Sequence, residues 1–167
     1  MSRFTVSITV TPLADGRSWV MYSPDFAYRV NDNPNDVVNV PGGFITDFAS
    51  VPRPLWWLYA PWGRHGHAAV LHDWGYYKQD RSRREYDHIF LEAMEVLGVG
   101  RFKRRVMWLA VRGPGWFAWK SNARRNQEEP GWKMATGRVP PPADVREQAP
   151  PERRVIDLTE GLGRTPR

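Results

Sequence analysis

The stretch "AAVLHDWGYYKQDRSRREYDHIF", residues 68–90, decides the fold. Its first part belongs to a predicted helix over residues 65–79, and its second part predicts another helix that begins at about residue 83. Between them, Ser82 and Glu85 have the spacing of a capping box. In that motif the serine caps backbone N–H groups while the glutamate reaches back to the start of the helix. The two helices should therefore form an antiparallel hairpin.

This hairpin would bring polar side chains together. His72 would lie level with Asp87 on the facing helix, and Tyr76 shares the His72 face at a spacing of four. A carboxylate bonded to one ring nitrogen of a histidine fixes the tautomer and raises the basicity of the other nitrogen, which can then take a proton from water. Asp73, turned about 100° around the helix, could hold Ca²⁺ beside it. The alternative is a histidine–aspartate pair with a purely structural role.

Asp47, in "GFITDFASVPR", has two interpretations. With Thr46 and Ser50 it could cap a following helix, because short polar side chains favour such positions. Equally, it could be a third carboxylate folded against His72, where it would join Asp73 as a metal ligand.

The rest of the chain predicts strands and one more helical stretch. Residues 3–45 contain short segments rich in Val, Tyr, Phe and Ile, separated by turn formers, which is typical of short antiparallel strands. A third helical stretch covers residues 101–125, and Gly113-Pro114-Gly115 should break or kink it.

These elements predict one α+β domain. A small antiparallel β region occupies residues 1–50, and a helical region with the hairpin and a third, kinked helix occupies residues 51–125. Residues 126–167 are rich in proline and poor in large apolar side chains, so we expect a tail that is extended or bound to a partner.

Composition excludes several classes of site. The chain has no cysteine, which rules out disulfides, thiolate zinc sites and cysteine nucleophiles. There is no Gly-rich phosphate loop, GxSxG elbow or HExxH motif. The N-terminus lacks signal-peptide features, and no apolar run reaches the roughly 20 residues of a membrane span. We expect a soluble protein made in the cytoplasm.

The charge favours anionic partners. The formal net charge is +6, and between residues 101 and 125 eight basic residues and no acid are interleaved with aromatic rings. Such a mixture suits a protein face, a lipid surface or nucleic acid, with protein docking favoured and nucleic acid the weakest of the three. Alternatively, Val106, Met107, Leu109 and Val111 pack on the hairpin while the cations are solvated. The predicted partner-binding residues are Trp56, Trp57, Trp62, Arg104, Arg105, Trp108, Trp116 and Trp119.

Two resemblances add to this interpretation. "VPGGFITDFASVPRPLWWL", "AAVLHDWGYY" and "SRREYDHIFLEAMEVLGV" together resemble a family of uncharacterised proteins of tailed phages and prophages, a domain of unknown function that is sometimes described as tail-associated. This resemblance covers most of residues 25–113. It implies a phage origin and, more loosely, a role in the virion or its tail.

The second resemblance is local. "HDWGYY" and "RSRREYDHIF" are similar to the two helices of secreted and viral phospholipase A2 enzymes, in which His-Asp-x-x-Tyr is followed by an aspartate and then an aromatic residue. The resemblance implies that His72 is the general base and that Asp73 is a Ca²⁺ ligand. It also implies that Asp87 orients His72, with Tyr76 supporting Asp87 and Phe90 packing nearby. The Gly-rich calcium loop of those enzymes has no clear counterpart before the helix.

Two functions are therefore expected. The first is a structural or assembly protein of the phage tail region, which docks on other virion proteins and is assembled in the host cytoplasm. The alternative is a Ca²⁺-dependent hydrolase of phospholipid or another envelope ester or amide.

Overall fold

The computed structural model describes residues 4, 10–13, 18–21, 25–47 and 65–136. The strands are β1 (Val10–Pro12), β2 (Trp19–Met21), β3 (Phe26–Arg29), β4 (Val37–Val40) and β5 (Ile45–Thr46). A short 3-10 turn, Val30–Asp32, lies between β3 and β4. The helices are α1 (Gly66–Lys78), α2 (Arg83–Val96), α3 (Arg101–Arg112) and α4 (Gly115–Glu128). The predicted α+β class, with short antiparallel strands before a helical hairpin, is confirmed.

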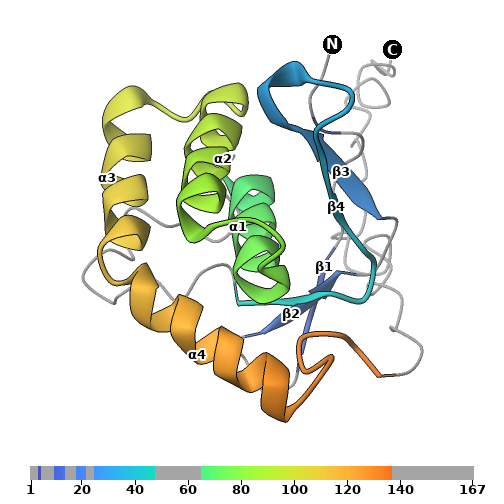
Figure 1. Cartoon of the computed structure of the whole chain (residues 1–167). Coiled ribbons are helices and arrows are strands. Elements are labelled where there is room, and N and C mark those ends of the chain that lie inside the picture. The colour runs from blue at the N-terminus through green and yellow to red at the C-terminus, as the bar shows by residue number, and fades with distance from the viewer. Residues whose placement is uncertain (1–3, 5–9, 14–17, 22–24, 48–64, 137–167) are drawn as a thin grey trace, which may run out of the picture.

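The strands form two small antiparallel sheets. One has the order β1-β2-β5, and the other pairs β3 with β4. In the second sheet Phe26 pairs with Val40 and Tyr28 with Val38, and all four side chains are buried because alternate residues of a strand point to the same face. Both sheets lie on one side of α1, and α2 lies on another (Figure 1).

Helix α1 is the centre of the domain. Every residue from Ala68 to Tyr76 is buried, so no solvent-facing stripe interrupts that stretch. A helix covered on all sides needs no amphipathic pattern. Its polar side chains, His72 and Asp73, are therefore buried with its apolar ones.

The hairpin forms as predicted. Ser82 accepts a hydrogen bond from the backbone N–H of Glu85, and the Glu85 carboxylate accepts one from the backbone N–H of Ser82, which completes the capping box. The two helices approach closely at Gly75, where the ring of Tyr86 occupies the space that a side chain would need.

The third helical stretch is two helices. The prediction that Gly113-Pro114-Gly115 would break or kink this stretch is confirmed, because α3 ends at Arg112 and α4 begins at Gly115. Pro114 stands between the helices, where its missing N–H and fixed φ end one helix and start the next. Among the described residues, no helix is long and apolar enough to cross a membrane.

The folded domain continues past the expected boundary at residue 125. α4 runs to Glu128, and the turn after it returns to the first sheet. Met134 bridges to Phe44, and the backbone N–H of Ile45 donates to the carbonyl of Lys133 at 2.7 Å. Residues 126–136 are thus part of the domain, and the remainder of the predicted tail lies outside the described residues.

Candidate functional site

Asp87 is the centre of a buried polar cluster. Its side chain, on the second turn of α2, is fully buried. Oδ1 lies 3.1 Å from Nε2 of His72 and accepts a hydrogen bond from the Tyr76 hydroxyl at 2.8 Å. The predicted contact between His72 and Asp87 is confirmed, and Tyr76 supports the same carboxylate oxygen.

The imidazole of His72 is held by rings as well as by Asp87. Its centroid lies 4.2 Å from the ring of Tyr76 and 4.9 Å from the ring of Phe90, so its plane has little freedom to turn. A carboxylate can only accept, so Nε2 must carry the proton of the bond to Asp87. No described residue makes a hydrogen bond to Nδ1, and this nitrogen is then the basic one.

Two arginines complete the cluster, and neither was predicted as a site residue. Arg112 Nη1 lies 2.9 Å from Oδ2 of Asp87, and Arg83 Nη1 lies 3.3 Å from the same oxygen. Arg83 also donates to the backbone carbonyl of Arg112 at 2.9 Å, which ties the end of α3 to the hairpin. Arg83 stands four residues before Asp87, a helical ion-pair spacing that could have identified it. No local signal identifies Arg112.

These partners keep Asp87 ionised. Burial raises the pKa of its carboxyl, but the hydrogen bonds from His72 and Tyr76 and the nearby Arg112 lower the pKa by more, and the net shift is downward. For Tyr76, burial and the bond to Asp87 raise the pKa, so its hydroxyl stays protonated and continues to donate.

Asp73 and Asp47 occupy different surroundings. Asp73 is buried, and its Oδ2 accepts a hydrogen bond from the Thr46 hydroxyl at 2.5 Å. Asp47 lies 3.7 Å from Nζ of Lys133 and is about one-third exposed. Thr46, which we considered only as a cap, is the last residue of β5 and contacts α1 through Asp73. The segment that Asp47 was expected to cap lies outside the described residues.

A calcium site is not complete in this part of the chain. Ca²⁺ takes six to eight oxygen ligands, usually with several carboxylates among them. Across the described residues, no group of three or more His, Asp or Glu side chains could hold a metal ion. Asp73 and Asp47 alone do not meet the requirement, so ligation of Ca²⁺ by them stays a prediction.

Helix α4 also contacts the cluster. A Cβ on Gly115 would lie 2.5 Å from the Tyr76 hydroxyl, and the ring of Trp119 meets Tyr76 edge-on at 5.2 Å. Asn122 donates to the backbone carbonyl of Tyr76 at 3.1 Å, which satisfies a terminal carbonyl of α1. The start of α4 thus fixes the end of α1 that carries Tyr76.

The predicted partner-binding residues divide into three groups. Trp108 and Trp119 are partly buried and pack against the core, and Arg104 pairs with Glu95 at 2.8 Å. These three have contacts within the domain, and partner binding by them stays a prediction. Arg105 and Trp116 are exposed. Trp56, Trp57 and Trp62 lie outside the described residues. Leu109, which we expected as an alternative to pack on the hairpin, is 60% exposed, whereas Met107 is buried.

These features define a class of protein, an α+β domain whose helical hairpin buries a histidine–aspartate pair. The chain belongs to the family described as "Protein of unknown function (DUF1353)", which matches residues 14–111, more than half of its length. The matched range includes both His72 and Asp87.

One curated relative is also uncharacterised. Over 110 residues the chain is 34% identical to the "Uncharacterized protein y4jT" of Sinorhizobium fredii (strain NBRC 101917 / NGR234). The aligned part covers 62% of this chain and 31% of that protein, so the chain spans about a third of the relative's length. No solved structure matches the chain at a significant level.

Proposed function

We propose that the chain is a hydrolase in which His72 is the general base and Asp87 orients it. The observation that carries this proposal is the bond between Nε2 and the Asp87 carboxylate, which leaves Nδ1 as the basic nitrogen. The substrate class is an ester or amide of the cell envelope, with phospholipid the first candidate because of the local similarity to phospholipase A2.

The reaction would follow from this geometry. Nδ1 of His72 removes a proton from a water molecule, whose oxygen attacks the carbonyl carbon of the scissile bond. The imidazolium that forms is stabilised by Asp87, which is already ionised. The proton then passes from Nδ1 to the leaving oxygen or nitrogen as its bond to carbon breaks. The products are a carboxylic acid and an alcohol or amine.

The proposal does not assume that Ca²⁺ is bound. Asp73 is the residue through which Ca²⁺ would lie beside His72, and the ion would stabilise the negative charge on the carbonyl oxygen. Because the described side chains do not complete a calcium site, no step above is assigned to a metal.

The resemblance to tailed-phage proteins suggests where the hydrolase would act. We propose a virion protein of the tail region, assembled in the host cytoplasm, that acts on the host envelope. Its support is the order and spacing of the three quoted sequence segments, which resemble the tailed-phage proteins. We expect mass spectrometry to show that the chain is enriched in purified particles. Its complete absence from particles would contradict the proposed location in the virion.

The hydrolase is tested by a matched pair of variants. The amide of His72→Gln can still donate to Asp87 but has no basic nitrogen, whereas His88→Gln changes an exposed histidine whose Nδ1 lies near the Arg84 carbonyl. Hydrolysis of phospholipid and of peptidoglycan is measured with and without Ca²⁺ or Zn²⁺. We expect His72→Gln to lower the rate by about 10² to 10⁴ and His88→Gln to leave it unchanged.

Circular dichroism and thermal unfolding show whether each variant is folded. The proposal fails if a folded His72→Gln protein keeps the wild-type rate. It also fails if the wild-type protein hydrolyses neither substrate under any of the metal conditions.

A further inference from the structure

Large apolar side chains are exposed on one part of the domain. Five such residues are exposed in the described part of the chain, and four of them lie on α3 and the first turn of α4. Phe102 is 77% exposed and Phe117 70%. Single exposed apolar side chains are normal on a protein surface, whereas a group of them calls for an explanation. The four residues are Phe102, Leu109, Trp116 and Phe117.

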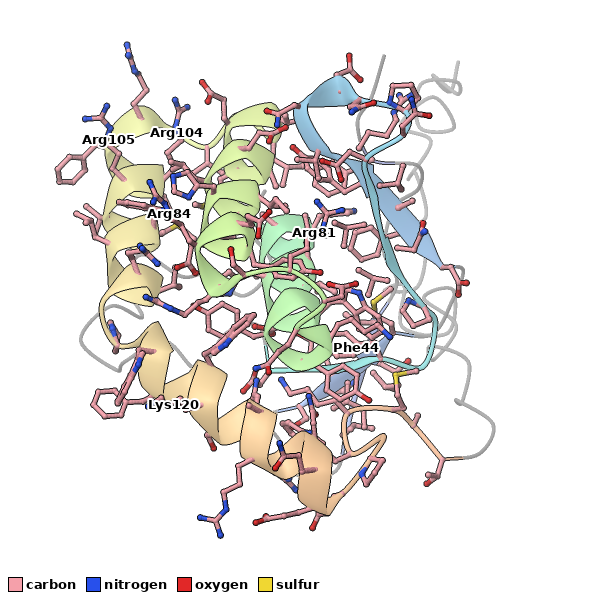
Figure 2. The ribbon with its side chains drawn as sticks, viewed as in Figure 1. Phe44, Arg81, Arg84, Arg104, Arg105 and Lys120 are labelled. Carbon is pink, nitrogen blue, oxygen red and sulfur yellow. The ribbon has the colours of Figure 1, made fainter. Side chains whose placement is uncertain are left out.

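Cations alternate with these apolar residues. Phe102 and Leu109 are seven residues apart on one side of α3, and the exposed Arg105 stands between them. On α4, Nζ of Lys120 lies 4.2 Å from the ring centroid of Trp116. Figure 2 shows Arg105 and Lys120 on the side of the molecule turned away from the strands. We call this surface the α3–α4 face: Arg101, Phe102, Arg105, Leu109, Trp116, Phe117 and Lys120.

The positive charge of the α3–α4 face is not balanced. Eight basic residues and no acid lie between residues 101 and 125. Half of the eight have carboxylate partners: Arg104 with Glu95, Arg112 with Asp87, Arg124 with Glu128 and Arg125 with Glu129. In the described part of the chain, the other four pair with no acid, and three of these, Arg101, Arg105 and Lys120, are exposed and belong to the α3–α4 face. Water can solvate these cations, but together with the exposed apolar side chains they suit an anionic partner that also accepts hydrocarbon.

We propose that the α3–α4 face docks on an anionic lipid surface. Arg and Lys would contact headgroup phosphates, while the phenyl, indole and leucine side chains enter the boundary of the acyl region. This inference deepens the proposed hydrolase, on which it rests for its substrate, by naming an aggregated anionic phospholipid as that substrate.

Other partners fit this chemistry less well. The buried centre of a protein interface is depleted in charge, whereas here a cation stands beside each apolar group. Nucleic acid would stack on ring faces, but Lys120 lies over one face of the Trp116 ring, and Leu109 gains nothing from phosphates. A lipid surface satisfies both kinds of side chain at once.

The two helices that carry the α3–α4 face, α3 and α4, also contact the His72–Asp87 site. Arg112, at the end of α3, binds Asp87, and Gly115, at the start of α4, lies against the Tyr76 hydroxyl. Docking would therefore place the membrane against the same two helices that position His72 and Asp87. A phospholipid substrate would then not have to move far from the bilayer surface to reach His72.

The test uses the full-length His72→Gln protein, so that binding is measured without turnover. Sedimentation with vesicles of phosphatidylcholine alone is compared with vesicles that also contain phosphatidylglycerol. We expect binding only to the anionic vesicles, with an affinity that falls as salt is raised. In this background, Phe102→Ala with Phe117→Ala should weaken binding by about tenfold or more, and Arg105→Glu with Lys120→Glu by about as much.

The control is Lys78→Glu, which makes the same kind of charge change beside β4 and should bind like its parent. No binding to anionic vesicles, or binding that neither double variant weakens, would overturn the inference. So would binding that needs nucleic acid or a purified virion protein instead of lipid. Vesicle binding by a wild-type protein that hydrolyses nothing would leave docking in place and refute only the hydrolase.

Discussion

Replacing Asp87 with alanine is expected to lower the free energy of unfolding by about 3–5 kcal/mol. The fully buried carboxylate serves four donors. Its loss leaves the Arg112 guanidinium, the Tyr76 hydroxyl and the His72 N–H without this acceptor, while Arg83 keeps its bond to the Arg112 carbonyl. Unpaired buried polar groups are more costly than the original pair is favourable. Urea denaturation followed by circular dichroism measures the change.

A surface pair provides the control. Asp36 accepts from Arg81 at 2.6 Å, but its side chain is about one-third exposed. Asp36→Ala should therefore lower stability by less than about 1 kcal/mol. If the two alanine variants lose equal stability, Asp87 is not the centre of the cluster.

The contribution of Asp87 to the free energy of unfolding should also depend on pH, in a defined direction. Although burial alone raises its pKa, the cluster holds the folded-state pKa below the usual value. Its stabilisation is then fully present above the unfolded-state pKa of about 3.9 and is lost as the pH falls through the folded-state pKa. The stability difference between the wild type and Asp87→Asn should accordingly be constant near neutrality and shrink in acid.

Gly75→Ala is expected to lower the free energy of unfolding by about 3 kcal/mol or more. Alanine inside a helix normally gains about 1 kcal/mol over glycine. Here, however, a Cβ would lie 2.0 Å from the Tyr86 ring, which is fully buried. The Tyr86 hydroxyl also bonds Asp80, so the ring cannot move without losing that bond. The overlap therefore exceeds the gain in propensity.

Gly100→Ala is the matched control. Nothing lies within 4 Å of a Cβ at this helix start. The change should alter stability by less than about 1 kcal/mol, through the weaker N-cap alone. Thermal unfolding of both variants under the same conditions compares them, and a Gly75→Ala protein as stable as the wild type would show that α1 and α2 are not packed this closely.

Local signals explain why the hairpin could be predicted. The capping box at Ser82 and Glu85 sets where α2 begins, and this fixes the register that brings His72 level with Asp87. The Gly-Pro-Gly sequence also indicated the break between α3 and α4. It did not indicate whether the helix would only kink or would end and start again. The continuation through residue 136 could not be predicted, because it depends on the pairing of Met134 with Phe44.

The candidate site was predictable only where sequence spacing is local. His72, Tyr76 and Asp87 share the hairpin, whereas Thr46 reaches Asp73 from a strand and Arg112 reaches Asp87 from the end of another helix. Such contacts depend on how whole elements pack. Leu109 illustrates the same limit, since its helical spacing is compatible with burial, yet it is 60% exposed.

The proposed function depends on one structural claim, that Asp87 holds His72 as the Nε2–H tautomer with Nδ1 as the basic nitrogen. Ring ¹⁵N chemical shifts of His72, recorded at about pH 8 where an ordinary imidazole is neutral, measure this directly. We expect a proton on Nε2 and an unprotonated Nδ1. A proton on Nδ1, or shifts that average the two tautomers, would contradict the arrangement and leave His72 without the role proposed for it.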